Sequence, residues 1–155
     1  MNKFNKIRTG VIGVGSMGQN HARVYDEISN LVGVYDKDTS QSKRVANRFD
    51  LPFYSNIEDL LNNVDAVSIA VPTYLHLDIA KKVASFGVHM LVEKPLAMNA
   101  FDSKEIVDLS KKNKVKLAVG HIERYNPVIK YAKNAIKSGE WGEIITLSSK
   151  RVSSY

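Results

Sequence analysis

The sequence predicts an α/β fold with a doubly wound parallel sheet, because short apolar runs alternate with longer segments of helical periodicity. Five apolar runs are expected to be strands, and they cover residues 7–14, 31–35, 66–71, 90–92 and 115–119. Each run is almost continuously apolar, as is typical of parallel strands that are buried on both faces. Right-handed crossovers would then place the intervening helices on both faces of the sheet.

Six helices are expected, over residues 18–28, 40–49, 55–61, 75–86, 99–112 and 127–138. Ser55 and Glu58 form a capping-box pattern at the start of the third helix. Asn99 is expected to cap the fifth helix, and Pro127 stands in the first turn of the sixth. A further apolar stretch, residues 143–152, predicts one more strand near the C-terminus.

The composition excludes several classes of protein. The chain has 155 residues, of which 44% are hydrophobic and 25% charged, so we expect an ordinary globular domain. No apolar run approaches the roughly 18–20 residues that span a bilayer, and the N-terminus lacks the apolar segment of a signal peptide. The absence of cysteine excludes disulfides and thiolate chemistry and fits a reducing cytoplasm. Together these observations predict a cytoplasmic protein without a membrane partner.

The formal net charge of +6 needs an explanation. The lysines are spread along the chain, and those of residues 130–137 recur at helical spacing, which indicates solvated helix faces. A nucleic-acid site would need a dense basic stripe with stacking aromatics, and the sequence has none. We therefore expect no nucleic-acid partner.

A glycine-rich loop joins the first strand to the first helix. It has the pattern G-x-G-x-x-G and consists of Gly13, Val14, Gly15, Ser16, Met17 and Gly18. Gly13 permits the tight turn, Gly15 lets the backbone approach a pyrophosphate, and Gly18 lets the helix pack on the sheet. Glycines also mark ordinary turns, so the context decides, and after a strand and before a helix the loop predicts dinucleotide binding.

Asp36 ends the second strand, at the place where a carboxylate can bind the adenosine ribose hydroxyls. The same carboxylate would repel the 2′-phosphate of NADP, whereas Lys37 would offset part of that repulsion. We therefore expect NAD, with NADP less favoured. The alternative is that Asp36 merely initiates the second helix.

Polar residues follow the later strands at the edge where open α/β sheets bind ligands. Glu93 and Lys94 precede Pro95 at the end of the fourth predicted strand, and an ammonium there can hold a substrate hydroxyl. The alternative is a surface Glu–Lys pair. Val71, Pro72 and Thr73 would turn the backbone under the cofactor, and these residues are expected to bind it.

Histidines are scattered in the sequence. His76 lies in the first turn of the helix after Thr73, where a structural role is the alternative to a binding one. Arg124 and Tyr125 follow the fifth predicted strand and are candidates for substrate contact. The four histidines form no local ligand pair, so no metal is predicted.

These motifs together resemble the N-terminal half of the Gfo/Idh/MocA oxidoreductases, the glucose–fructose oxidoreductase and inositol dehydrogenase family. The glycine loop, Asp36, the segment 64–76 and Glu93-Lys94-Pro95 carry the resemblance, which covers nearly the whole chain. It implies a Rossmann domain of an enzyme that transfers hydride from a secondary hydroxyl of a sugar or cyclitol to NAD(P). Residues 120–127 look like the branch that oxidises the 3-hydroxyl of UDP-N-acetylglucosamine or its uronic acid.

The resemblance also implies roles for single residues. Lys94 would be the catalytic lysine that contacts the reacting hydroxyl, and Glu93 and His76 would line the nicotinamide pocket. Family members continue into a C-terminal domain that supplies a catalytic His, usually with an Asp, much of the substrate pocket and the oligomer interface. We therefore expect a cofactor domain over residues 1–125 and the start of a substrate and oligomerisation domain over residues 126–155.

Two further expectations follow from the resemblance. The full-length form would be a homo-oligomer with a sugar or nucleotide-sugar substrate, and this chain alone would bind NAD but turn over poorly. The alternative function is a stand-alone dinucleotide-binding sensor or regulatory module, which would have no need of a lysine at the hydride site.

Overall fold

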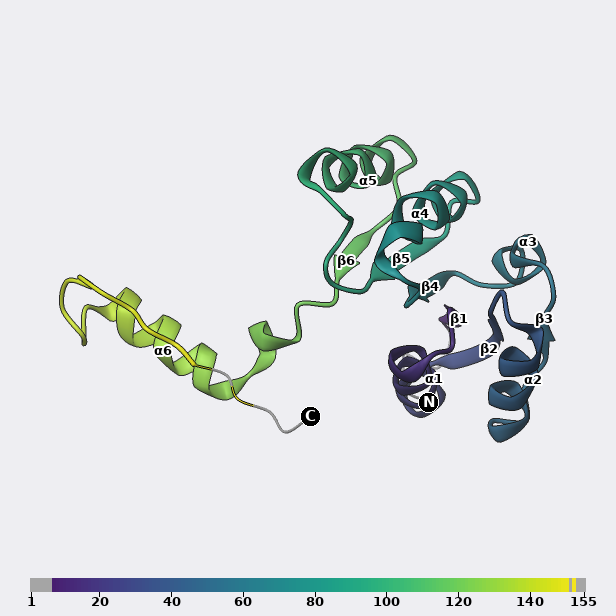
Figure 1. Ribbon diagram of the computed structural model, residues 1–155, viewed down its shortest axis with the longest axis horizontal. Coiled ribbons are helices and arrows are strands. Elements are labelled where there is room, and N and C mark those ends of the chain that lie inside the picture. Colours follow the sequence, from purple (N-terminus) through teal and green to yellow (C-terminus); the bar gives the residue numbers. More distant parts are fainter. Residues whose placement is uncertain (1–6, 151, 153–155) are drawn as a thin grey trace. The chain divides into compact units, whose positions relative to one another are not determined.

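The computed structural model of the chain describes residues 7–150 and residue 152. The chain falls into two compact units, Met1–Gly120 and His121–Tyr155. The first unit contains the whole sheet, and the second is built around one long helix (Figure 1).

The sheet of the first unit has six parallel strands in the order β3-β2-β1-β4-β5-β6. They are β1 (Arg8–Ile12), β2 (Asn30–Tyr35), β3 (Phe53–Tyr54), β4 (Ala66–Ile69), β5 (His89–Val92) and β6 (Leu117–Val119). This arrangement is the doubly wound Rossmann topology and confirms the predicted fold class. Strand β3 is absent from the predicted strands, since it is too short for a periodic pattern and is defined by its pairing with β2.

Helices cover both faces of this sheet (Figure 1). They are α1 (Ser16–Ile28), α2 (Thr39–Arg48), α3 (Ile57–Leu61), α4 (His76–Ser85) and α5 (Ala100–Lys112), with a short 3-10 helix, η2 (Thr73–Leu75), before α4. The winding reverses after β3, so α1 and α2 pack on one face and α4 and α5 on the other. The reversal leaves a crevice between β1 and β4 at their carboxyl ends, where ligands bind in such folds.

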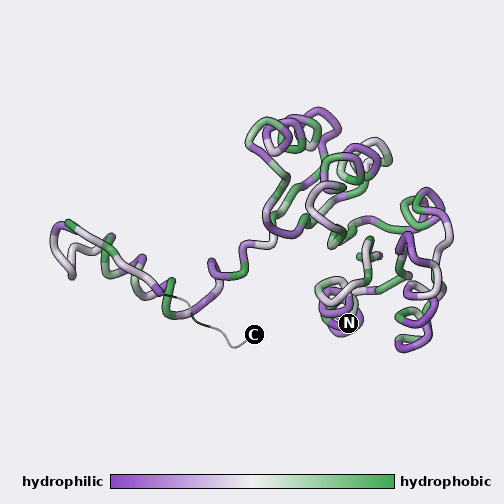
Figure 2. The backbone as a smooth tube through the Cα atoms, viewed as in Figure 1, coloured by the Kyte–Doolittle hydropathy of each residue, from purple (hydrophilic) through white to green (hydrophobic). Residues whose placement is uncertain are grey.

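Two apolar cores follow from the two covered faces. One joins the sheet to α3, α4 and α5 and includes Ile69 and Ile106, and the other joins it to α1 and α2 and includes Val34 and Val45. Figure 2 shows hydrophobic residues along the strands of the first unit and mixed polarity along its helices. None of the described helices has the length and apolar character needed to cross a membrane.

The helix ends test the predicted caps. Asn99 caps α5 as predicted, and its side chain accepts a hydrogen bond from the backbone N–H of Asp102 at 2.8 Å. The prediction for Ser55 is wrong, because α3 begins later than expected. The N-cap of α3 is Asn56, whose side chain accepts a hydrogen bond from the backbone N–H of Glu58 at 3.0 Å. Asn is an equally good cap, so the capping box did not discriminate between neighbouring residues.

The second unit contains a 3-10 helix, η3 (Ile122–Tyr125), and helix α6 (Pro127–Ser138). Pro127 stands in the first turn of α6, and the helix ends at Ser138, both as predicted. Gly139 follows it in a left-handed backbone conformation. The strand predicted over residues 143–152 is wrong for the part that the structure describes, since residues 143–150 carry no strand. A strand needs a hydrogen-bonded partner, and this segment has none among the described residues. Residue 151 lies outside the described residues.

Truncation of a core side chain tests the packing of α3 against β1. Leu60 is fully buried, and its methyl groups lie against Gly10 of β1. Leu60→Ala should lower the free energy of unfolding by about 2–5 kcal/mol, because it leaves a cavity in the core. Leu147→Ala, at an exposed residue, should change it by less than about 0.5 kcal/mol. Equal denaturant midpoints for the two variants would contradict the described core.

Candidate functional site

The predicted site residues meet because the parallel ladder continues one residue past the carboxyl ends of the strands. Gly13 donates a backbone hydrogen bond to Tyr35 O, and Ala70 donates one to Ile12 O, both at 2.8 Å. Glu93 donates to Ile69 O at 3.0 Å and Gly120 to Val92 O at 2.8 Å. Gly13, Ala70, Glu93 and Gly120 therefore stand in one row across β1, β4, β5 and β6, although they are far apart in the sequence.

The glycine loop has the geometry that its motif demands. Gly13 has a φ of +84°, which side chains rarely adopt. A Cβ on Gly18 would lie 1.8 Å from the carbonyl oxygen of Gly13, so only glycine lets α1 start this close to the strand. A Cβ on Gly15 would meet nothing within 4 Å, so space remains open beside the backbone there.

The start of α1 offers unshared backbone donors beside that open space. Gly15 is the N-cap and provides no side-chain hydrogen bond, whereas α2, α3, α5 and α6 are all capped by Asp or Asn side chains. Free N–H groups and the positive end of the helix dipole favour an anion at this point. The residues present therefore fit the pyrophosphate of a dinucleotide, with Gly15, Ser16 and Met17 nearest the helix start.

Asp36 lies next to the glycine loop rather than at the start of a helix. Its carboxylate accepts a hydrogen bond from the backbone N–H of Val14 at 2.7 Å and another from the N–H of Asp38 at 2.9 Å. The N-cap of α2 is Asp38, whose pKa is lowered because its carboxylate accepts hydrogen bonds from the side chain of Ser40 and from backbone N–H groups. The helix-initiating role considered for Asp36 thus belongs to Asp38. Lys37 is exposed beside Asp36.

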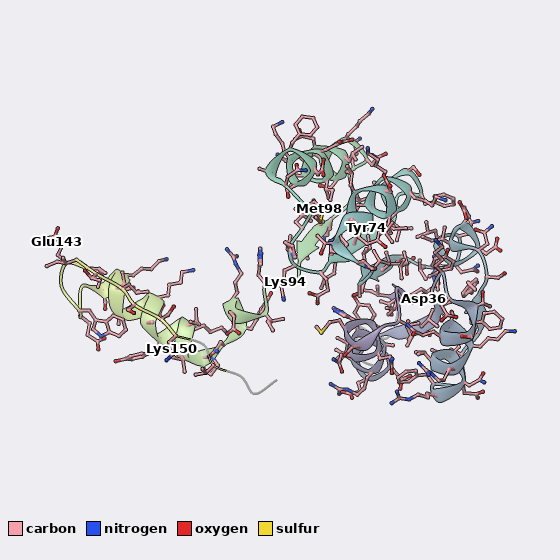
Figure 3. The ribbon with its side chains drawn as sticks, viewed as in Figure 1. Asp36, Tyr74, Lys94, Met98, Glu143 and Lys150 are labelled. Atoms are coloured by element: carbon pink, nitrogen blue, oxygen red, sulfur yellow. The ribbon has the colours of Figure 1, made fainter. Side chains whose placement is uncertain are left out.

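A small pocket opens at the ends of β4 and β5. Six of its lining residues are those expected near the nicotinamide: Val71, Pro72, Thr73, His76, Glu93 and Lys94. The lining also includes Met17 of the glycine loop and Ala70. Lys94 is exposed, and its ammonium has no ion-pair partner in the part of the chain that the structure describes. Figure 3 labels Lys94 and Asp36, which follow β5 and β2. An unpaired ammonium at a pocket mouth is available to a substrate hydroxyl.

His76 ties two loops of this pocket together. The ring is buried, with Nε2 lying 3.0 Å from Val71 O and Nδ1 lying 3.0 Å from Pro95 O and 3.2 Å from Leu96 O. It therefore joins the loop after β4 to the loop after β5, which includes a cis Lys94-Pro95 bond. His76 lines the pocket and supports its walls, which agrees with the structural role, while its binding role stays a prediction.

Glu93 is the most enclosed charged residue of the site, 7% exposed. One carboxylate oxygen lies 2.9 Å from Nε2 of His21, and the other accepts a hydrogen bond from the backbone N–H of Lys94 at 3.1 Å. Gly120 closes the opposite side, since a Cβ there would lie 3.0 Å from the carboxyl group of Glu93. This burial excludes the alternative in which Glu93 and Lys94 form a surface pair.

No sequence pattern had placed His21, Ser68 and Tyr25 in the site. Ser68 Oγ lies 3.1 Å from Nδ1 of His21 and 2.8 Å from the hydroxyl of Tyr25, and burial raises the pKa of Tyr25. The one available signal is that Met17, His21 and Tyr25 recur at i, i+4 spacing on α1 and so share a face. Nothing in that spacing points to Glu93, which is 72 residues away from His21.

Arg124 and Tyr125 belong to the second unit, where they line a surface groove with residues of α6: Ile129, Lys130, Lys133, Asn134 and Lys137. The ammonium of Lys130 lies 5.7 Å from the ring centre of Tyr125. This distance is within the range of a cation–π contact. No cluster of three or more metal-ligating side chains occurs in residues 7–150 or at residue 152.

Two alanine substitutions in the glycine loop compare a tightly packed glycine with one that faces open space. In Gly18→Ala the new methyl group meets a backbone oxygen. This variant should therefore lose roughly 2 kcal/mol or more of its free energy of unfolding. Gly15 has a φ of −64°, which suits alanine. Gly15→Ala should change the free energy of unfolding by less than roughly 1 kcal/mol. Chemical denaturation measures both, and similar losses for the two variants would contradict the loop geometry.

Comparison with known proteins shows the family to which the chain belongs. The model of the oxidoreductase family with an NAD-binding Rossmann fold, GFO_IDH_MocA, matches residues 7–121. UDP-N-acetylglucosamine 3-dehydrogenase of Acidithiobacillus ferrooxidans is 38% identical over 129 residues, which are 83% of this chain and 41% of that protein. Inositol 2-dehydrogenase of Corynebacterium glutamicum is 32% identical over 151 residues, 91% of this chain and 44% of that protein. The chain thus spans about two fifths of the length of these relatives.

Solved structures show the same fold. The A. ferrooxidans enzyme superposes with a TM-score of 0.81 over 84% of this chain and 43% of its own, at 38% identity. The WlbA dehydrogenase of Bordetella pertussis, in complex with NADH and UDP-GlcNAcA, superposes with a TM-score of 0.82 over 88% of this chain and 43% of its own, at 30% identity. On the family match, the chain belongs to the Gfo/Idh/MocA oxidoreductase family and carries its NAD-binding Rossmann fold.

Proposed function

We propose that the chain is the cofactor-binding part of an NAD-dependent dehydrogenase that oxidises a secondary hydroxyl of a sugar, nucleotide sugar or cyclitol. The observation that carries the proposal is the pocket at the ends of β4 and β5, in which the buried Glu93 stands beside the unpaired ammonium of Lys94. The bound nicotinamide would supply the hydride acceptor.

The residues of this chain would divide the work of binding. The N–H groups at the start of α1 would hold the pyrophosphate, and Asp36 would hold the adenosine ribose, while Lys37 lies close by. Val71, Pro72 and Thr73 would support the nicotinamide end. Because Asp36 is a carboxylate next to the loop, we propose NAD rather than NADP as the preferred cofactor.

Lys94 would act on the substrate. Its Nζ can hold the oxygen of the reacting hydroxyl by a hydrogen bond and stabilise the negative charge that develops there as the hydroxyl proton leaves. Residues 126–155 would begin the substrate and oligomerisation domain, with Arg124 and Tyr125 near that boundary contacting substrate.

We propose a nucleotide sugar as the substrate class, and the names of two relatives support it. The 3-dehydrogenase of A. ferrooxidans is named for UDP-N-acetylglucosamine, and WlbA was solved with UDP-GlcNAcA. The groove that contains Arg124 and Tyr125 is also lined by lysines, which suits an anionic substrate such as a nucleoside diphosphate sugar. A non-catalytic dinucleotide sensor is the alternative, but it leaves the exposed Lys94 without a role.

Calorimetric titration with NAD and NADP tests the cofactor assignment. The chain should bind NAD more tightly than NADP, and Asp36→Asn should remove most of this preference while its amide oxygen still accepts from Val14 N–H. Asp36→Ala should also lose the preference and should bind NAD more weakly. Asp26→Asn, on the exposed face of α1, is the control and should retain the wild-type dissociation constants. Absence of binding to either cofactor would refute the proposed function.

Lys94→Ala tests the chemistry in the protein that joins this domain to its substrate-binding part. The dissociation constant for NAD should stay within a few-fold, while turnover of a sugar-nucleotide substrate should fall by about 10²–10⁴, the range for a positioned acid–base group. Lys81→Ala, which breaks a surface ion pair with Glu105, should retain full turnover. Unchanged turnover in the Lys94 variant would remove Lys94 from the mechanism.

A further inference from the structure

A chain of hydrogen bonds runs from the interior of the first unit to the floor of the pocket. It links the hydroxyl of Tyr25 to Ser68 Oγ, Ser68 Oγ to Nδ1 of His21, and Nε2 of His21 to the Glu93 carboxylate, at 2.8, 3.1 and 2.9 Å. Ser68 is fully buried and Glu93 nearly so, and no buried side-chain donor or acceptor in the described residues lacks a partner.

The groups in this series of hydrogen bonds keep their partners whether His21 is neutral or protonated. The Ser68 hydroxyl donates to Tyr25 in the structure, and this suits a protonated ring, whose Nδ1–H donates to Ser68 while Nε2–H donates to Glu93. When the ring is neutral, Nε2–H still donates to Glu93, and the Ser68 hydroxyl can turn from Tyr25 to donate to Nδ1. Rotation of the Ser68 hydroxyl therefore gives its hydrogen an acceptor in either state.

His76 provides a contrast within the same pocket. Its two ring nitrogens face only carbonyl oxygens, which accept and cannot donate, so its surroundings cannot reverse in the same way. Of these two histidines only His21, which contacts the pocket residue Glu93, has a hydroxyl beside it that can turn, and a proton gained or released by His21 changes the net charge of the His21–Glu93 pair between −1 and 0.

Several groups lie around this pair. From α1, Tyr25 stands at the other end of the same hydrogen-bond chain, and burial raises its pKa, while β4 contributes the neutral Ser68. The end of β5 contributes Glu93 itself and Lys94, and Gly120 on the remaining side has no side chain. Lys94 and His76 also line the pocket.

We propose that the His21–Glu93 pair makes the site favour the oxidised, positively charged nicotinamide over the reduced, neutral one, and that the proton on His21 sets the strength of this preference. The inference rests on the proposed function, since Glu93 lines the pocket assigned to the nicotinamide. A pair with a net charge of −1 attracts a cationic ring, and a neutral pair does not. His21 is thus a positioning and specificity-determining residue for the redox form of the cofactor.

The test is the dissociation constants of NAD⁺ and NADH, measured by calorimetry on the whole chain between about pH 5.5 and 8, the range in which histidines generally titrate. The ratio of the NADH constant to the NAD⁺ constant should rise about three- to tenfold with pH. His21→Gln keeps a donor for Glu93 and an acceptor for Ser68 but cannot titrate. Its ratio should be independent of pH and equal to the wild-type value at the upper end of the range.

Two more variants complete the series. Glu93→Gln should lower the ratio at every pH, because the negative charge is gone. His89→Gln is the matched control, since His89 begins β5 at the opposite end of that strand and accepts a hydrogen bond from the N–H of Lys116. It should retain the wild-type pH dependence.

Proton NMR of the four histidines gives a measurement on the unmodified chain. The missing signals in the His21→Gln and His89→Gln spectra identify both rings. NAD⁺ should move the titration of His21 to lower pH than NADH does, while the titration of His89 should not differ between them. The same His21 titration with both cofactors, or an unchanged pH dependence in His21→Gln, overturns the inference. Failure of the wild-type chain to bind either form would instead refute the proposed function.

Discussion

Parallel pairing at the carboxyl edge of the sheet is the constraint on which the whole site depends. One backbone hydrogen bond beyond each strand end aligns Gly13, Ala70, Glu93 and Gly120 in a single row. The backbone hydrogen bonds of this row fix the position and direction from which each following loop starts. The glycine loop, the turn after β4 and the loop after β5 therefore converge on one pocket, although they lie far apart in the sequence.

The two ends of the site favour ligand groups of opposite charge. The uncapped start of α1 presents backbone donors and a positive dipole end, which suit phosphate oxygens. Glu93 is buried at the other end and is compensated by a histidine and a backbone N–H. A dinucleotide has matching polarity, since its anionic pyrophosphate and its cationic oxidised nicotinamide are held apart by the second ribose. The two ends thus suit one extended ligand better than two separate ones.

Two histidines serve the pocket by different means. His76 binds carbonyl oxygens of two loops and holds the walls together, while His21 stands between a carboxylate and a hydroxyl. The difference lies in the partners, because carbonyl oxygens only accept whereas hydroxyls can reverse. Identical side chains therefore join two loops in one place and link a carboxylate to a rotatable hydroxyl in the other.

Local patterns in the sequence were enough to predict the α/β class and five of the six strands. They were also enough to single out the glycine loop, Asp36 after the second strand, and the Glu93-Lys94-Pro95 element. Periodicity, glycine spacing and strand ends each depend on residues close together along the chain. Other features arise only when distant segments pair. Strand β3 exists through its pairing with β2, and residues 143–150 form no strand because no partner lies beside them in the described chain. The hydrogen bonds that link Tyr25 to Glu93 require α1, β4 and the end of β5 to meet, and only the folded sheet brings these groups within hydrogen-bond distance.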